Sequence, residues 1–320
     1  MIELSVVIPT LNRCNLLQEA LNSLANQTYS KNRFEVIVVD NGSVDKTKEI
    51  VDQYKSILPN LKYIYDERPG LHVGRHAGLK AAKGEILVYG DDDIYALPTW
   101  LEAIAESFSD NKVVLVGGNN YPKFEGKPPK WIKNLWMRTK WGKILPYYSV
   151  LDFGNKIKKI PAYYVWGCNF AIRKSVLLEM EGFHPDGMPK ELIFYRGDGE
   201  TAVSNYIEDK GYTTLFNPKA SVYHYVSKDR MTEQYIFKRG YMQGISDSYT
   251  QIRNLRDIPY SIIFKNMFQA LKKIASIYFL SCPQIKKIYY CGYWKGYIEH
   301  QCKVRKNPKL LKWILKKNYL

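Results

Sequence analysis

Three consecutive carboxylates, at residues 91–93, follow the apolar run EILVY at 85–89. That run predicts a buried strand, and open α/β sheets bind their ligands beyond the carboxyl ends of the strands. Clustered carboxylate oxygens suit Mg²⁺ or Mn²⁺, and substrate phosphates commonly complete the shell of such an ion. We therefore expect a divalent cation here that joins the protein to a nucleotide diphosphate.

A second acidic locus is RGDGE at 196–200, which contains Asp198 and Glu200. In-line transfer of a group to a hydroxyl needs a carboxylate that removes the hydroxyl proton, besides a cation at the departing diphosphate. General-base assistance of this kind is worth roughly 10²- to 10⁴-fold in rate. The two acidic loci can supply these two roles, although Asp198 and Glu200 can also simply favour a helix N-terminus by their charge.

Other phosphate-binding motifs are missing from the sequence. No G-x-G-x-x-G follows the first apolar run, and no G-x-x-x-x-G-K-[ST] occurs anywhere in the chain. Neither a dinucleotide fingerprint nor a P-loop is therefore supported. The metal is left to neutralise the phosphate charge.

The first 120 residues alternate short apolar runs with helical patterns, which predicts a mostly parallel sheet covered by helices. Runs rich in β-branched residues are typical of strands buried on both faces. We predict strands at 4–8, 34–39, 61–65, 85–89 and 113–117.

Two helices are predicted between the first three of these strands. The first has a buried stripe, and Asn15 and Gln18 have the spacing of a capping box. Ser43 is positioned to cap the second helix. The predicted stripes are Leu16, Leu17, Ala20, Leu21 and Leu24 in the first helix, and Ile50, Val51, Tyr54, Ile57 and Leu58 in the second.

The pattern then changes along the chain. Residues 119–165, rich in Pro and Trp, predict a loop-rich stretch, and VWGCNFAIRKSVLLEMEGF predicts a short strand followed by a helix that ends near Gly182. RGDGE opens another helix, and from about residue 226 the sequence is helical, aromatic and basic. We find no internal repeat and no low-complexity tract.

The basic charge is concentrated in that last segment. From residue 225 to 320 there are 19 Lys or Arg and 5 Asp or Glu, a net charge of +14 out of +16 for the chain. A solvated helical face is the ordinary explanation. Attraction to an anionic membrane surface is the more specific explanation, because the charges are interleaved with aromatic and aliphatic residues. Nucleic-acid binding is not expected, since no recognised motif accompanies the charge.

Seven segments occur in the order found in family 2 glycosyltransferases, and the chain resembles that family from about residue 2 to 225. The resemblance implies the GT-A fold, an α/β fold with a Rossmann-like, mostly parallel sheet flanked by helices, here with a C-terminal helical extension. The matching segments are VVIPTLNR (6–13), QTYS (27–30), FEVIVVDNGSVDKT (34–47), RPGLHVGRHAGLKAAKGEILVYGDDD (68–93), WGCNFAIRKSVL (166–177), GDGE (197–200) and His224.

The resemblance also implies roles for individual residues. Asp198 is the implied catalytic base, and Asp93 and Asp91 form the D-x-D pair that holds Mn²⁺ or Mg²⁺. His224 is implied as a third metal ligand or a contact to the diphosphate. The implied substrate-binding residues are Thr10, Asn12, Arg13, Asp40, Arg75, Asp91, Asp92, Trp166 and Glu200. Thr10 and Asp40 are implied to contact the base and ribose, and Trp166 precedes the acceptor-side segment.

Ordinary explanations exist for several of these residues. Asp40 can cap the following helix, Asp92 can face solvent or lie behind the ligand, and a lone histidine such as His224 is usually structural. Arg75 can be a surface charge. The residue after Arg75 is His76, where the family usually has Asn, which leaves the donor contacts around Arg75 open.

The remaining features set the expected compartment. Five cysteines without zinc or disulfide spacing favour a reducing compartment, and no signal peptide or membrane-spanning run is recognised. We expect a cytoplasmic enzyme, peripheral on the cytoplasmic face of the membrane.

The domains expected are 1–225 for the glycosyltransferase, with a nucleotide-sugar half at 1–120 and an acceptor and catalytic half at 121–225, and a basic helical extension at 226–320. The partners expected are a nucleotide-sugar donor, with UDP the family's commonest nucleotide, and a glycan or lipid-linked acceptor of surface polysaccharide biosynthesis. A sugar-nucleotide pyrophosphorylase-like enzyme would carry a Gly-rich loop where this chain has PTLNR. A non-catalytic membrane- or nucleic-acid-binding protein would explain the basic segment but not the carboxylates.

Overall fold

The computed structural model describes residues 1–256, 259–279 and 283–320. Within these ranges the main sheet has eight strands in the order β11-β13-β6-β12-β4-β1-β2-β3. Neighbouring strands from β4 through β1 and β2 to β3 run parallel, whereas β12 runs antiparallel to both β4 and β6. The strands are β1 Leu4–Thr10, β2 Phe34–Asp40, β3 Leu61–Tyr65, β4 Ile86–Gly90, β6 Val113–Gly117, β11 Lys158–Lys159, β12 Asn169–Arg173 and β13 Thr213–Phe216.

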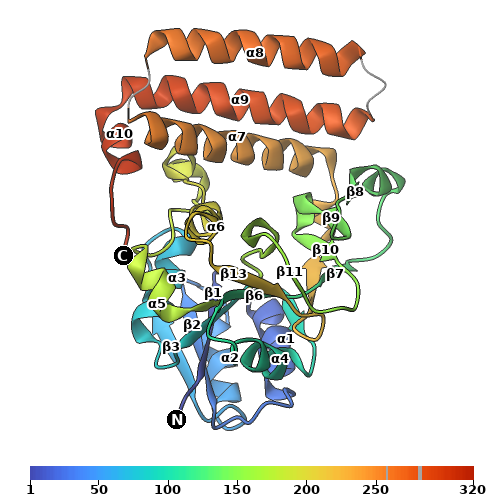
Figure 1. Cartoon of the computed structure of the whole chain (residues 1–320), viewed down its shortest axis with the longest axis vertical. Coiled ribbons are helices and arrows are strands. Elements are labelled where there is room, and N and C mark those ends of the chain that lie inside the picture. The colour runs from blue at the N-terminus through green and yellow to red at the C-terminus, as the bar shows by residue number, and fades with distance from the viewer. Residues whose placement is uncertain (257–258, 280–282) are drawn as a thin grey trace.

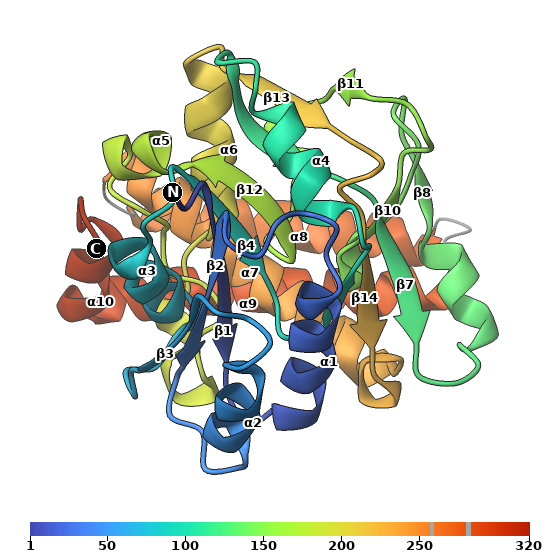
Figure 2. The same ribbon diagram turned by 90° about the horizontal axis from the view of Figure 1, so that it is seen from below.

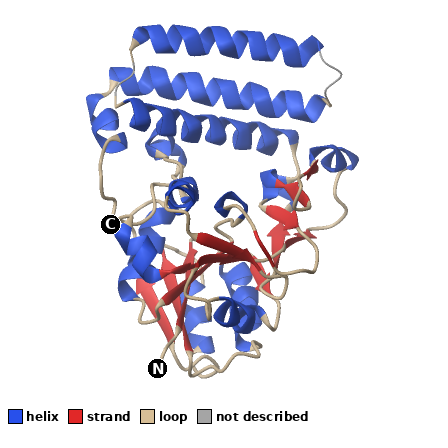
Figure 3. Ribbon diagram, in the orientation of Figure 1, coloured by secondary structure: helices blue, strands red, loops and turns tan. Residues whose placement is uncertain are grey.

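All five predicted strands are confirmed, as β1, β2, β3, β4 and β6. Strands β1 and β2 are buried along their whole length because helices cover both faces of the sheet (Figures 2 and 3). Helices α1, α2 and α4 pack on one face and α3, α5 and α6 on the other. The helices are α1 Cys14–Ala25, α2 Thr47–Tyr54, α3 Leu71–Ala81, α4 Trp100–Ser107, α5 Lys174–Glu179 and α6 Glu200–Asp209.

The predicted helix caps are wrong. Asn15 lies inside α1, and neither α1 nor α2 has a side-chain hydrogen bond from its own cap residue. Asp45, in the loop before α2, instead accepts from the backbone N–H of Cys14 and from that of Thr47, at 3.0 Å each. One carboxylate therefore satisfies donors at the start of both helices, a relationship that the local spacing of residues does not reveal.

The stretch predicted as loop-rich contributes β7, β8, β9 and β10 to a second sheet. In the described part of the chain this sheet has six strands in the order β5-β14-β7-β10-β9-β8. They are β5 Ile94–Ala96, β7 Asn120–Phe124, β8 Met137–Arg138, β9 Lys143–Leu145, β10 Val150–Asp152 and β14 Val222–Val226, interleaved with the 3₁₀ turns η1 Lys130–Leu135, η2 Pro146–Tyr148 and η3 Ala162–Tyr164. Strands of two to five residues show too little periodicity to be recognised.

This second sheet has a direct consequence for the carboxylate triplet. β5 begins immediately after Asp93 and pairs antiparallel with β14, with Ile94 opposite His224. Two segments about 130 residues apart are thereby held side by side. The pairing is what brings His224 to the acidic strand end.

The predicted helical character of the last segment is confirmed. Figure 1 shows the helices α7, α8 and α9 stacked on one side of the molecule, with α9 between α7 and α8. They are α7 Glu233–Leu255, α8 Tyr260–Phe279 and α9 Gln284–Lys306, followed by α10 Pro308–Ile314; two further 3₁₀ turns, η4 Lys190–Tyr195 and η5 Lys228–Arg230, precede α6 and α7. None of the helices in the described ranges combines the length and apolarity needed to cross a bilayer.

Helices α7 and α9 approach each other closely through two pairs of glycines. A Cβ at Gly244 would lie 2.0 Å from the carbonyl oxygen of Tyr293, and one at Gly296 would lie 2.1 Å from that of Tyr241. Gly240 and Gly292 make the equivalent contacts one turn away. Each helix thus carries a G-x-x-x-G pair, a spacing that lets two helix backbones touch.

Candidate active site

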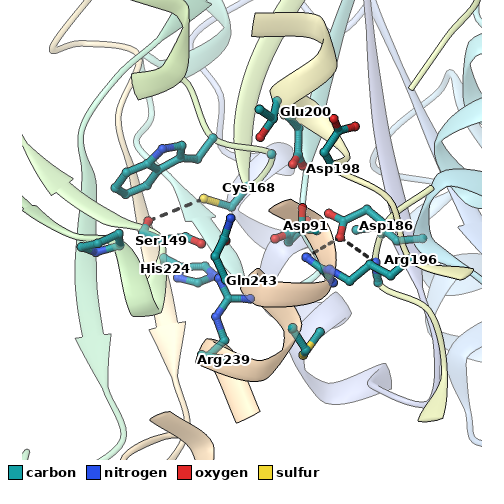
Figure 4. Close-up of a pocket in the computed structure, with 18 of the residues that line it drawn as sticks. Asp91, Ser149, Cys168, Asp186, Arg196, Asp198, Glu200, His224, Arg239 and Gln243 are labelled. Atoms are coloured by element: carbon teal, nitrogen blue, oxygen red, sulfur yellow. Dashed lines mark hydrogen bonds and ion pairs between the residues drawn. The ribbon is translucent and has the colours of Figure 1, made fainter. Parts of the chain in front are cut away.

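A cavity of about 650 Å³ lies between the carboxyl end of β4, the second sheet and helix α7. Figure 4 shows Asp198 and Glu200 on one side of this cavity, His224, Arg239 and Gln243 on the other, and Asp91 between them. A smaller neighbouring cavity, of about 360 Å³, shares Arg13 and Asp91 with the first. The two predicted acidic loci are therefore brought to one site.

The three neighbouring carboxylates have different partners. Asp92 is buried and accepts from the hydroxyl of Thr10 at 2.7 Å and from Arg13 at 2.5 Å, so it does not face solvent. Asp93 is also buried, pairs with Arg13 at 2.6 Å and lies 3.4 Å from Arg230. Asp91 projects into both cavities. Nearby arginines offset the repulsion among the three carboxylates.

These surroundings shift the pKa values in opposite directions. Burial raises the pKa of Asp92 to about 7 and also raises the pKa of Asp91, whose ionisation is further opposed by Asp93. Burial acts in the same direction on Asp93, but His224 and Arg13 outweigh it and hold the pKa of that carboxyl below its usual range. Asp93 is thus the member of the triplet most strongly held as an anion.

The residues at this end of the cavity fit a divalent cation. His224 Nδ1 donates to the carbonyl oxygen of Tyr148 at 2.7 Å, and His224 Nε2 lies 3.3 Å from Asp93 Oδ1. Asp93 Oδ1 is buried and has no hydrogen bond in the described ranges. A ligating histidine is commonly fixed through its other ring nitrogen in this way, and carboxylate and imidazole groups suit Mn²⁺.

Cys168, which the sequence did not suggest, lies close to two of the predicted metal ligands. Ligand atoms of Asp91, His224 and Cys168 lie within 4.8 Å of one another. Burial raises the pKa of the Cys168 thiol well above its ordinary value, so this sulfur stays protonated and is the poorer ligand. Cys14, Cys291 and Cys302 are also free thiols, and Cys282 lies outside the described residues.

The opposite wall of the cavity carries Asp198 and Glu200. Asp198 is buried, and its two carboxylate oxygens accept from His184 Nδ1 at 2.6 Å and from the Thr250 hydroxyl of α7 at 2.7 Å. Glu200 accepts from Arg75 at 2.5 Å. The RGDGE segment therefore presents two carboxylates with separate, fixed partners.

Arg75 connects the two acidic loci and is not a surface charge. Its guanidinium is almost fully buried, bonded to Glu200 and 3.9 Å from Asp91. Burial alone would lower its pKa, but Glu200 and Asp91 outweigh burial and raise it, so the side chain is a permanent cation. A Cβ at Gly167 would lie 1.9 Å from Glu200 and 2.3 Å from Arg75, which explains the glycine of the WGCN segment.

The other predicted residues are divided between the two cavities and the surrounding loops. Thr10 and Asp92 line the smaller cavity, and Trp166 lines the larger one, where its ring nitrogen donates to the carbonyl of Tyr163. Asp40 lines neither, because its oxygens accept from Ser43 N–H and the Tyr63 hydroxyl. Asn12 lines neither and accepts from Val44 N–H. Nucleotide contacts by Asp40 and Asn12 stay predictions.

His76, the departure from the family pattern, also lies behind the site. Its Nε2 accepts from Phe183 N–H at 2.9 Å and its Nδ1 lies 3.1 Å from the carbonyl oxygen of Tyr319. The imidazole therefore bridges the loop before Asp186 to the last residues of the chain. An asparagine side chain is too short to span the same two partners.

Several residues of the cavity wall were missed by the sequence analysis. Asp186 pairs with Arg196 at 2.7 Å, and one face of α7 contributes Arg239, Met242, Gln243 and Ser246. A P-D-G turn at 185–187 was the available signal for Asp186. The residues of α7 had none, because on a helix they look like an ordinary polar face.

The sequence of this chain is similar to those of known glycosyltransferases. The family model described as "Glycosyl transferase family 2" matches residues 5–180. The glycosyltransferase AglE of Haloferax volcanii is 42% identical over 116 residues, 36% of this chain and 38% of that protein. Validoxylamine A glucosyltransferase of Streptomyces hygroscopicus subsp. jinggangensis is 30% identical over 200 residues, 57% of this chain and 47% of that one. The chain thus spans less than half the length of these two relatives.

Solved structures give the same fold. A mannosyltransferase from Pyrobaculum calidifontis in complex with GDP-Man and Mn²⁺ has a TM-score of 0.57 at 18% identity, covering 96% of this chain and 88% of that one. Residues 1–349 of S. aureus TarS with UDP-GlcNAc give a TM-score of 0.51 at 18% identity, covering 95% of this chain and 92% of that chain. At such identity the likeness establishes a GT-A type fold and no more.

Proposed function

Because the chain belongs to glycosyl transferase family 2, we propose that it transfers a sugar, with inversion, from a nucleotide-sugar donor to a hydroxyl of a glycan or lipid-linked acceptor. The observation that carries this proposal is that both acidic loci line one cavity, which adjoins a second cavity at Asp91. The family match favours a transferase over the pyrophosphorylase-like and non-catalytic alternatives.

The donor occupies the smaller cavity and the adjoining part of the larger one. Thr10, Arg13 and Asp92 line the nucleotide end, and UDP is the nucleotide we propose. Asp93, Asp91 and His224 would hold Mn²⁺ or Mg²⁺ at the diphosphate. When bound, the ion supplies charge stabilisation for the departing diphosphate, worth several kcal/mol.

Asp198 acts as the base in this proposal. A single displacement with inversion requires the acceptor hydroxyl to lie opposite the leaving group, so the base must lie across the cavity from the metal end. In Figure 4 Asp198 lies on the other side of the cavity from His224, and His184 and Thr250 hold its carboxylate. Arg75 holds Glu200 in place beside it. Trp166 offers an aromatic face to a sugar of the acceptor.

The acceptor and the location are proposed from the surface of the last helices. Five large apolar side chains of α8 are 40% to 67% exposed: Tyr260, Phe264, Met267, Phe268 and Leu271, named here the α8 stripe. They recur at helical spacing on one face, and Lys265, Lys272 and Lys273 are exposed nearby. An apolar face bordered by lysines suits an anionic membrane surface. We place the enzyme on the cytoplasmic face of the membrane, and residues 226–320 form a helical extension to a glycosyltransferase domain of residues 1–225.

The test is binding of nucleotide diphosphates followed by thermal unfolding. UDP, GDP and dTDP are each added with Mn²⁺ or with EDTA, and one of them should raise the unfolding temperature only with Mn²⁺, since a ligand of the native state stabilises it by mass action. Asp93→Asn should lose that increase, whereas Asp209→Ala, an exposed carboxylate at the end of α6, should keep it. Absence of any metal-dependent increase in the unsubstituted protein would refute the proposal.

A further inference from the structure

A third and smaller cavity opens from the α7 side of the proposed active site. It measures about 220 Å³ and is lined by Met137, Pro146, Tyr147, Arg239, Gln243, Tyr289 and Tyr290. Pro146, Arg239 and Gln243 also line the large cavity, whereas none of these residues lines the nucleotide end. The two cavities therefore meet at Arg239, on the side of the site away from the proposed nucleotide.

Arg239 differs from the other arginines of the large cavity. Arg13, Arg75, Arg196 and Arg230 each lie within ion-pair distance of a carboxylate. Arg239 has no such partner in the ranges that the structure describes. Its charge lowers the pKa of Asp186 from a longer distance. The 220 Å³ cavity that Arg239 also lines has no carboxylate in its lining, so this partly buried guanidinium is free to bind an anion from outside.

The neighbours of Arg239 suit a chain of sugar or polyol units. Gln243 lies one turn further along α7 and is oriented by a 2.8 Å hydrogen bond from its amide to Asp247, which leaves its carbonyl oxygen as an acceptor for a hydroxyl. Across the cavity, Tyr289 packs edge-on against Tyr147 and Tyr290, with distances between ring centroids of 4.9 Å and 5.5 Å, respectively. Tyrosine rings present apolar faces at little cost in conformational entropy.

We propose that Arg239 binds a phosphoryl group of the acceptor and that the acceptor continues from there across Tyr289 and Tyr290. This inference rests on the proposed function and specifies the acceptor as an anionic one. A guanidinium matches phosphate oxygens with two parallel N–H donors, which favours arginine at such a position. The phosphoryl group can belong to a phosphodiester within a polymer or to the diphosphate that joins a glycan to a lipid.

The test measures binding of two probes after the donor site has been filled. Isothermal titration is done with saturating UDP and Mn²⁺ present, using either an oligomer of glycerol phosphate or farnesyl diphosphate, with a neutral oligosaccharide for comparison. We expect one of the two phosphoryl probes to bind better than the neutral sugar, and the probe that binds identifies the source of the phosphate. Arg239→Gln should weaken that binding by at least about tenfold.

The matched control removes the same charge from the next residue. Lys238 is exposed on α7 and lines none of these cavities, so Lys238→Gln should leave probe binding within about twofold. Arg239→Lys should bind more weakly than the unsubstituted protein because the bidentate geometry is lost. Tyr290→Ala provides a second variant that keeps all charges and should also weaken the probe that binds.

Three outcomes would overturn the inference. They are equal affinity of the unsubstituted protein for phosphoryl probes and the neutral sugar, unchanged probe binding in Arg239→Gln, and loss of UDP binding rather than probe binding in that variant. The last result would show that Arg239 belongs to the donor-binding site. Failure of the proposed function is distinguishable, because the unsubstituted protein would then bind no nucleotide diphosphate with Mn²⁺ in the first place.

Discussion

His184 Nδ1 lies 2.6 Å from Asp198 Oδ1, and the histidine ring packs edge-on against Tyr249 and Tyr319. The hydroxyl groups of these two tyrosines are 2.7 Å apart. Tyr249 belongs to α7 and Tyr319 follows α10, so the helical segment holds the histidine that holds the proposed base. A segment distant in sequence thereby sets the position of a carboxylate in the cavity.

Asp198→Asn should strongly reduce transfer and leave donor binding intact. The amide keeps the size of the side chain but cannot remove a proton, so we expect kcat to fall by roughly 10²- to 10⁴-fold. Transfer is measured as release of nucleotide diphosphate in the presence of acceptor, and UDP affinity is measured in parallel. Turnover at the normal rate in this variant would remove Asp198 from the role of base.

His184→Ala should reduce kcat by a smaller factor, about tenfold, with little change in donor affinity. The carboxylate of Asp198 loses one of its two fixed partners and keeps Thr250, so it is less well oriented rather than absent. His184→Asn, which can still donate a hydrogen bond, should recover part of the loss. If both variants lose donor binding and activity together, His184 maintains the fold rather than the base.

The contribution of His72 and His76 to the free energy of unfolding should decrease as the pH falls below about 6.5. Burial lowers the pKa of His72 to about 4 and that of His76 to about 3, whereas both groups titrate near 6.5 in the unfolded chain. Between these values only the unfolded state binds the protons, which costs up to about 1.4 kcal/mol per pH unit for each histidine. Calorimetric Tm values at pH 7 and pH 5 should differ less in His76→Asn than in the unsubstituted protein. Equal differences in the two proteins would show that His76 does not contribute.

Gly244→Ala should destabilise the chain by about 1–3 kcal/mol. The added Cβ would lie 2.0 Å from the carbonyl oxygen of Tyr293, so α7 and α9 must separate. Because α7 also lines the large cavity, transfer should fall as well. Gln234→Ala, an exposed change on the same helix, should stay within about 0.5 kcal/mol; a similar loss in both variants would contradict the close-packing explanation.

Leu271→Glu should weaken binding to vesicles that contain an anionic phospholipid. Leu271 is 65% exposed in the α8 stripe, and placing a charge there removes an apolar contact worth about 1.5–3 kcal/mol, or roughly tenfold or more in partitioning. Gln269→Glu introduces the same negative charge at an exposed position of α8 outside the stripe and should have a smaller effect. Co-sedimentation with vesicles measures both. Equal losses would indicate that only net charge matters.

The sequence predicts the parts of the fold that repeat a strong local pattern. β1 and β2 are recognisable because both faces are buried, and the conjunction of D-D-D with G-D-G-E locates the two acidic loci. The pairing of β5 with β14, the double cap by Asp45 and the position of Arg239 could not be predicted. Each depends on contacts between segments far apart in the chain. Neither the composition of the sequence nor the periodicity of its apolar residues predicts such contacts.

The glycine contacts between α7 and α9 have a consequence for how this enzyme can be altered. Gly240 and Gly244 directly follow Arg239 and Gln243 in the sequence, so the same turns that fasten the two helices also carry side chains to the cavity. Helices α7 and α9 therefore form one rigid unit, and the residues of α7 that face the cavity can be substituted without disturbing the packing between the two helices. Laboratory evolution of a new acceptor preference should therefore vary the side chains of α7 that line the large cavity and leave the proposed nucleotide cavity, which none of them lines, unchanged.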